Sequence, residues 1–163
     1  METKLLQALN RQINHEFYGA YLYFAMSTYF DEIVMKGFSS FMKHKASEAL
    51  SVAQKIYDYI ILRDEKLTFL KIEEPTADWI NVSDIFSSAL SHEEFMLAKI
   101  QELYKIANEY EDIAAIEYIF RLINAQTSEV AYFRKLMFRI KNSNLFPPNI
   151  ELLDEVISKQ NLN

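Results

Sequence analysis

A regular pattern of apolar residues runs through residues 118–136. The apolar positions recur every three or four residues, which predicts one long helix with a continuous apolar face. Gln126 and Glu129 lie on this face, and because they are three residues apart they project from the same side of the helix. A carboxylate directed into a helix bundle must be protonated, paired or bound to a metal, because burial of a bare charge is very costly. The apolar residues of this face are Ile119, Leu122, Ile123, Val130, Phe133 and Leu136.

The same periodicity predicts three further long helices and a short C-terminal helix. Thr3 is the expected N-cap of the first helix. Pro147 and Pro148 end the fourth helix, because proline cannot continue a helix. We expect a single all-α domain over residues 1–163, with its bundle over about 3–141. The remaining predicted helices cover about residues 3–30, 38–62, 83–108 and 147–160, with turns near 31–37 and 109–112.

Residues 64–82 show no helical periodicity and contain the only tryptophan, Trp79. A connection of this length is uncommon between packed helices. It is long enough to run the whole length of a bundle, so the second and third helices are expected to point the same way. One long crossover of this kind separates such a bundle from a simple up-down-up-down arrangement.

Composition and charge exclude several classes of protein. The chain of 163 residues has a net charge of −6, which argues against nucleic acid as a partner. It contains no cysteine, which excludes disulfides, thiolate zinc sites and iron–sulfur clusters. Its first residues resemble neither a signal peptide nor a membrane span. We therefore expect a cytoplasmic protein that does not contact membranes.

Three of the predicted helices direct polar side chains inward. Glu16 comes from the first helix, Glu93 from the third, and Gln126 and Glu129 from the fourth. Clusters of oxygen ligands suit divalent ions such as iron(II) or manganese(II). The alternative is a hydrogen-bonded polar cluster that includes Tyr23 or a similar hydroxyl.

The histidines do not complete the usual diiron pattern, which needs Glu-x-x-His pairs. No Glu-x-x-His occurs in the chain. His15 and His92 directly precede Glu16 and Glu93, which turns each histidine about 100° away from the inward face. We expect both histidines at the surface. Gly19 lies within the first helix, which indicates close approach of another backbone.

Four motifs together resemble those of bacterial-type, haem-free ferritins. The first helix carries LNRQINHEFY at residues 9–18 and YLY at 21–23. The second helix ends with YDYI at 57–60, and the fourth carries QTSE at 126–129. The crossover contains EEP shortly before Trp79. The resemblance covers essentially the whole chain.

The resemblance implies a fold, a cargo and an assembly. The fold is a ferritin-like four-helix bundle with a long crossover between helices two and three and a short fifth helix. Ferritins of this kind oxidise iron(II) at a diiron centre in each bundle and store the iron(III) mineral inside a 24-subunit shell. Iron is therefore the expected ligand, and the chain is expected to self-assemble, alone or mixed with other ferritin chains. Haem is not expected, because Leu50 and Glu129 stand where haem-binding bacterioferritins carry methionine and histidine.

The resemblance also assigns candidate site residues by position. The carboxylates and the amide on the first, third and fourth helices match ligands of the family's diiron centre, with a tyrosine beside them. Glu48 on the second helix matches a further ligand. The candidate metal residues are Glu16, Glu48, Glu93, Gln126 and Glu129, with Tyr23 near the centre, and no catalytic residue is assigned.

The second helix departs from the family's pattern. Ala49 stands where the family has the glutamate that bridges the two irons, and Val52 stands where it has a histidine ligand. The family's accessory iron position uses the residue at Glu48, but its two helix-four carboxylates are replaced by Ala125 and Ser128. Because paired irons deliver two electrons to dioxygen, we expect rapid oxidation of iron(II) to be lost or weak.

Lys45 lies one turn before Ala49 on the same helix. Its ammonium either neutralises the carboxylates that have lost their metal or extends to solvent. Three functions remain open at this stage: a storage shell with a degraded centre, a structural or co-assembling chain that no longer handles iron, and a single-metal enzyme that uses Glu16, Glu93 and Glu129.

Overall fold

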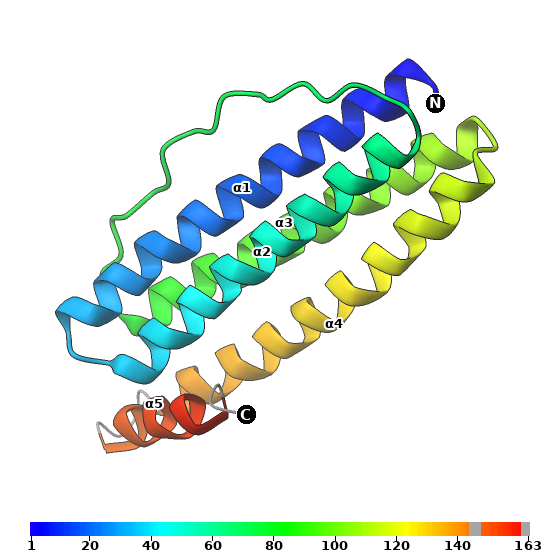
Figure 1. The fold of residues 1–163 in the computed structure, drawn as a ribbon. Coiled ribbons are helices and arrows are strands. Elements are labelled where there is room, and N and C mark those ends of the chain that lie inside the picture. Colours follow the sequence, from blue (N-terminus) through cyan, green and yellow to red (C-terminus); the bar gives the residue numbers. More distant parts are fainter. Residues whose placement is uncertain (144–147, 161–163) are drawn as a thin grey trace.

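The computed structural model describes residues 1–143 and 148–160, and over these residues it contains helices and no strand. The first four helices lie side by side as an elongated bundle, and the fifth lies at one end of it (Figure 1). The all-α prediction is confirmed, and the segment 118–136 lies within one helix. The helices are α1 (Thr3–Glu32), α2 (Lys36–Leu62), α3 (Val82–Glu109), α4 (Ile113–Ser143) and α5 (Pro148–Gln160).

The predicted helix ends need small corrections. Thr3 is the first residue of α1 rather than its cap: Glu2 is the N-cap, and its side chain makes no capping hydrogen bond. The predicted start of the short helix at residue 147 lies outside the described residues, and so does Pro147. Asn81 caps α3, since its side chain accepts a hydrogen bond from the backbone N–H of Asp84 at 3.0 Å.

The crossover between α2 and α3 runs along the length of the bundle, so α2 and α3 point the same way, as predicted (Figure 1). Two asparagines of α1 hold it in place: the Asn10 side chain accepts a hydrogen bond from the N–H of Thr68 at 2.9 Å, and Asn14 donates one to the carbonyl of Lys71 at 3.2 Å. The indole of Trp79 donates a hydrogen bond to the hydroxyl of Ser88 on α3 at 3.2 Å.

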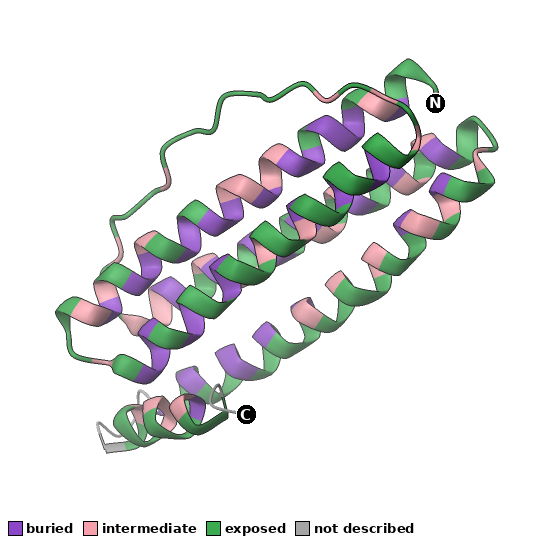
Figure 2. Ribbon diagram, viewed as in Figure 1, coloured by how far each residue is buried: buried purple, intermediate pink, exposed green. Residues whose placement is uncertain are grey.

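Buried residues face the interior along all four long helices (Figure 2). Near α5 the core is aromatic: the ring of Phe86 is fully buried and lies 5.1 Å from that of Phe38 and 5.7 Å from that of Phe30. The opposite end is mainly aliphatic, with Leu5, Leu9, Ile56, Ile60, Ile100 and Leu103. The two apolar groups enclose the bundle's middle, where polar side chains turn inward.

The short helix α5 supplies the capping hydrogen bond at the N-terminus of α2. No side chain at the N-cap of α2 makes a capping hydrogen bond. Instead, Asp154 of α5 accepts a hydrogen bond from the N–H of Phe38 at 2.6 Å. Gly37 permits this contact, because a Cβ there would lie 2.0 Å from the main-chain oxygen of Asp154. In the part of the chain that the structure describes, no helix is long and apolar enough to cross a membrane.

Candidate functional site

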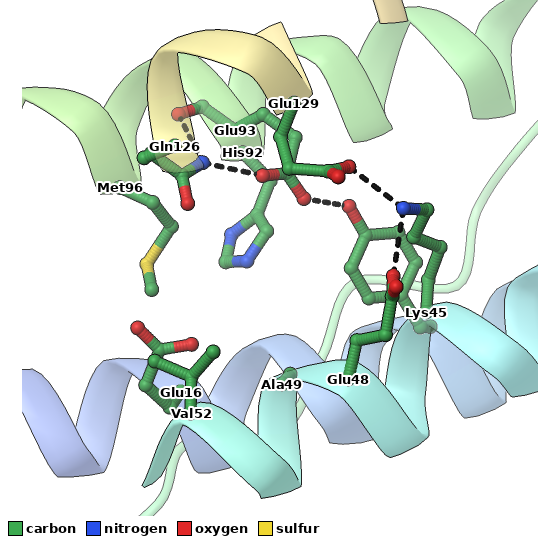
Figure 3. A pocket seen from close by; sticks show the side chains of 11 residues that line it. Glu16, Lys45, Glu48, Ala49, Val52, His92, Glu93, Met96, Gln126 and Glu129 are labelled. Carbon is green, nitrogen blue, oxygen red and sulfur yellow. Dashed lines mark hydrogen bonds and ion pairs between the residues drawn. The ribbon is translucent and has the colours of Figure 1, made fainter. Parts of the chain in front are cut away.

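A small cavity of about 60 Å³ lies inside the bundle, and all four long helices contribute to its walls (Figure 3). Every candidate metal residue predicted from the sequence lines it, as do Tyr23 and the two apolar replacements on α2. Its lining residues are Glu16, Tyr23, Lys45, Glu48, Ala49, Val52, His92, Glu93, Met96, Gln126 and Glu129.

Glu93 is buried and is held by two neighbours. Its carboxylate accepts a hydrogen bond from the hydroxyl of Tyr23 and another from the amide of Gln126, whose nitrogen also lies 3.1 Å from the Glu93 carbonyl oxygen. Burial raises the pKa of Glu93, although both hydrogen bonds oppose the rise. Burial also raises the pKa of Tyr23 well above its usual range, so the phenol remains a hydrogen-bond donor. For Glu93, the structure therefore contains the hydrogen-bonded cluster that was the alternative to a metal.

Glu129 also lines the cavity and is paired with Lys45. The ammonium nitrogen of Lys45 lies 2.7 Å from a carboxylate oxygen of Glu129 on α4 and 2.7 Å from one of Glu48 on α2 (Figure 3). Burial opposes the charge on Lys45, but the two hydrogen bonds outweigh it and raise its pKa. Only 10% of the Lys45 side chain is exposed, so the lysine neutralises carboxylates and does not extend to solvent.

Glu16 stands apart from both groups, beside Val52 and facing Met96 (Figure 3). Its carboxylate accepts a hydrogen bond from the amide of Gln12 at 2.9 Å. Burial raises the pKa of Glu16 to about 8, the Gln12 hydrogen bond lowers it, and the nearby charge of Glu93 raises it further. Glu16 is therefore largely protonated at neutral pH.

The candidate residues share one cavity but do not converge on one point. Among the described residues, no three carboxylate or imidazole side chains gather closely enough to hold a metal ion. Each of three cavity carboxylates instead has its own partner: Gln12 for Glu16, Tyr23 for Glu93, and Lys45 for Glu129. Chemically, the arrangement is a set of stabilised carboxylates around a small polar space.

A model of the Ferritin-like domain matches residues 6–143. The chain belongs to the ferritin family. The Bacterial non-heme ferritin of Staphylococcus saprophyticus is 34% identical over 133 residues, which make up 82% of this chain and 80% of that relative. The protein of the same name from Staphylococcus aureus strain MRSA252 is 33% identical over 133 residues, with the same shares of 82% and 80%.

Solved structures agree with this ferritin fold. An open pore ferritin from the archaeon Archaeoglobus fulgidus superposes with a TM-score of 0.94 and is 31% identical, covering 97% of this chain and 96% of that one. A closed form engineered from the A. fulgidus ferritin gives the same TM-score of 0.94 at 31% identity, with coverage of 97% and 96%. The predicted ferritin-like bundle with a short fifth helix is thus confirmed.

In this ferritin chain, the surface position predicted for His92 is wrong. The imidazole is buried and lies against the rings of Tyr23 and Tyr18, with centroids 5.8 Å and 6.0 Å away. Burial lowers the pKa of His92 to about 4, so the ring is neutral at pH 7. His15 is half-buried, with its ring edge-on to that of Phe95 at 5.1 Å.

Gly19 explains how a ferritin helix pair accommodates this imidazole. A Cβ at Gly19 would lie 2.7 Å from Nε2 of His92. The close approach expected at Gly19 is present. The expected partner was wrong, because the approaching group is the His92 side chain and not a backbone. A glycine within a helical apolar pattern was thus the one sequence signal that could have placed His92 inside the bundle.

Gly19→Ala is expected to lower the free energy of unfolding by about 1–2 kcal/mol, because overpacking against His92 exceeds the helix preference of alanine, which is about 1 kcal/mol. In a His92→Ala background the clash is gone, so Gly19→Ala is expected to raise the free energy of unfolding by up to about 1 kcal/mol. Chemical denaturation of the four metal-free proteins measures this reversal of sign. An equal loss in both backgrounds would contradict the contact.

Proposed function

We propose that this chain is the subunit of a cytoplasmic iron-storage shell whose diiron centre is degraded, so that rapid oxidation of iron(II) is lost or weak. Membership of the ferritin family supports iron as the cargo, and the relatives named Bacterial non-heme ferritin support storage without haem. The proposed assembly is the 24-subunit shell of the family, formed by this chain alone or together with other ferritin chains. Each chain contributes a single domain to the shell.

The observation that carries this proposal is the apolar face of α2 in the cavity. Ala49 and Val52 line the cavity at the positions of the family's bridging glutamate and histidine ligand, and neither side chain can bind a metal. Two irons that share a bridging ligand can pass two electrons to dioxygen together. Without the bridge, an iron ion held at Glu93 or Glu129 would have no coupled neighbour.

The carboxylates of the cavity also favour a second candidate, a structural or co-assembling ferritin chain that handles no iron itself. Glu16, Glu93 and Glu129 each have a hydrogen-bond or ion-pair partner from the protein. A cluster satisfied in this way is stable without metal. A single-metal enzyme is the third candidate, and it would have to displace these partners.

Aerobic addition of iron(II) to the metal-free protein tests the proposal. We expect iron(III) to form no faster than about twice the rate of a protein-free control, while an active bacterial non-haem ferritin measured in parallel is at least about tenfold faster. Rapid oxidation at about two irons per chain would contradict a degraded centre. Size-exclusion chromatography tests the shell, and iron that co-elutes with it separates storage from a purely structural role.

A further inference from the structure

The part of the cavity lining formed by Glu48 of α2 and Glu129 of α4 is partly exposed to solvent, and Lys45 lies at this opening. The side chains of Glu48 and Glu129 are 46% and 36% exposed, whereas that of Lys45 is only 10% exposed. The two carboxylates come from different helices, and the ammonium group lies between them (Figure 3). Lys45 is therefore the cation that joins α2 to α4 at this level of the bundle.

We propose that Lys45 determines what this opening binds: its ammonium group occupies the position of a divalent cation between Glu48 and Glu129 and excludes such a cation from the pair. The inference rests on the proposed function, because it names the group that replaces a metal at one side of the degraded centre. It assigns Lys45 a role in selecting the ligand, beyond the loss of ligands at Ala49 and Val52.

The distances fit the position of a bound cation. The two carboxylate oxygens are at most 5.4 Å apart, because each lies 2.7 Å from the same nitrogen. Small divalent ions bind carboxylate oxygens at about 2.0–2.2 Å, so a modest rotation of either side chain would bring both oxygens onto one ion. The ammonium and a divalent ion would therefore compete for essentially the same point.

Packing holds the lysine in this place. Its ammonium lies 5.7 Å from the ring centroids of Phe41 and Tyr132 and 5.9 Å from that of Phe133. These three rings come from α2 and α4, so both helices of the opening contribute to the position. Without the ammonium, Glu48 and Glu129 would face each other as like charges, which favours uptake of another cation.

Lys45→Met tests the proposal, because methionine keeps much of the packing volume and removes the charge. The probe is manganese(II), which binds oxygen ligands, titrated into the metal-free shell by calorimetry. We expect Lys45→Met to bind manganese(II) at least about tenfold more tightly than the parent at one site per chain. Adding Glu129→Gln to this variant is expected to abolish the gain. The matched control is Lys43→Met, which removes an exposed lysine of α2 that pairs with Asp31 at 2.8 Å.

Lys45→Gln provides a second neutral variant if Lys45→Met does not fold. No gain of manganese(II) binding in a folded neutral variant, or an equal gain in Lys43→Met, would overturn the role of Lys45. Iron(II) oxidation by the parent is measured on the same preparations. A slow parent without the gain refutes only the inference, whereas a fast parent refutes the proposed function.

Discussion

Ala49→Glu combined with Val52→His is expected to raise the initial rate of iron(II) oxidation at least about tenfold over the parent. Both positions already line the cavity on α2, one turn apart on the same face of the helix. The new glutamate would extend toward the carboxylates of α3 and α4, and the new histidine lies beside Glu16 (Figure 3). The change therefore places a carboxylate and an imidazole at the two apolar positions by which α2 lines the cavity.

Stopped-flow absorbance of iron(III) after aerobic mixing measures this gain. The matched control is Leu50→Glu with Gln54→His, which places the same groups on exposed positions of α2 outside the cavity. Thermal unfolding of the metal-free proteins shows whether the new polar groups are tolerated. If the cavity variant folds, assembles and oxidises iron(II) no faster than its control, missing ligands are not the reason for slow oxidation.

Glu16→Gln is expected to stabilise the metal-free protein at pH 8 and to have little effect at pH 5. Burial raises the pKa of Glu16 from an ordinary value of 4.5 to about 8, so the folded chain keeps a proton that the unfolded chain has released. The contribution of protonated Glu16 to the free energy of unfolding is fully present below about pH 4.5 and falls as the pH rises toward 8. The fall amounts to roughly 3–5 kcal/mol at pH 8, and a neutral amide avoids it.

Melting temperatures at pH 5 and pH 8 measure this difference. The variant is expected to melt about 6–20 °C above the parent at pH 8 and close to it at pH 5. Glu94→Gln is the control for loss of a carboxylate, because Glu94 is exposed and pairs with Arg134 on the surface, an interaction of about 0–1 kcal/mol. A gain of equal size at both pH values would mean that Glu16 is ionised throughout.

The sequence predicted the helices and their order well because apolar periodicity encodes which face of each helix is buried. The crossover direction followed from length alone, since residues 64–82 are too many for a turn between adjacent helix ends. The inward carboxylates were found for the same reason: Glu16 and Glu93 interrupt apolar faces and are both buried. Tyr23, expected near the centre, is likewise buried, whereas the next residue, Phe24, is 46% exposed.

The partners of the carboxylates could not be predicted in the same way. Whether Lys45 reaches Glu129 or solvent depends on the separation of α2 and α4 and on the rings between them, which periodicity does not encode. His92 was misplaced because an ideal helical wheel gives a single outward direction, whereas a glycine on the neighbouring helix makes room for a large ring. Pairwise fit between helices decided both cases.

The position of Trp79 gives this chain a built-in optical probe. The indole donates a hydrogen bond to Ser88 and lines a surface pocket with Tyr18 and His92. His92 also lines the internal cavity. Since the chain has one tryptophan, its fluorescence arises from a single known place within the crossover. The emission wavelength and the quenching of Trp79 can therefore report, without any label, whether the crossover keeps its contact with α3 when an ion enters the bundle next to His92.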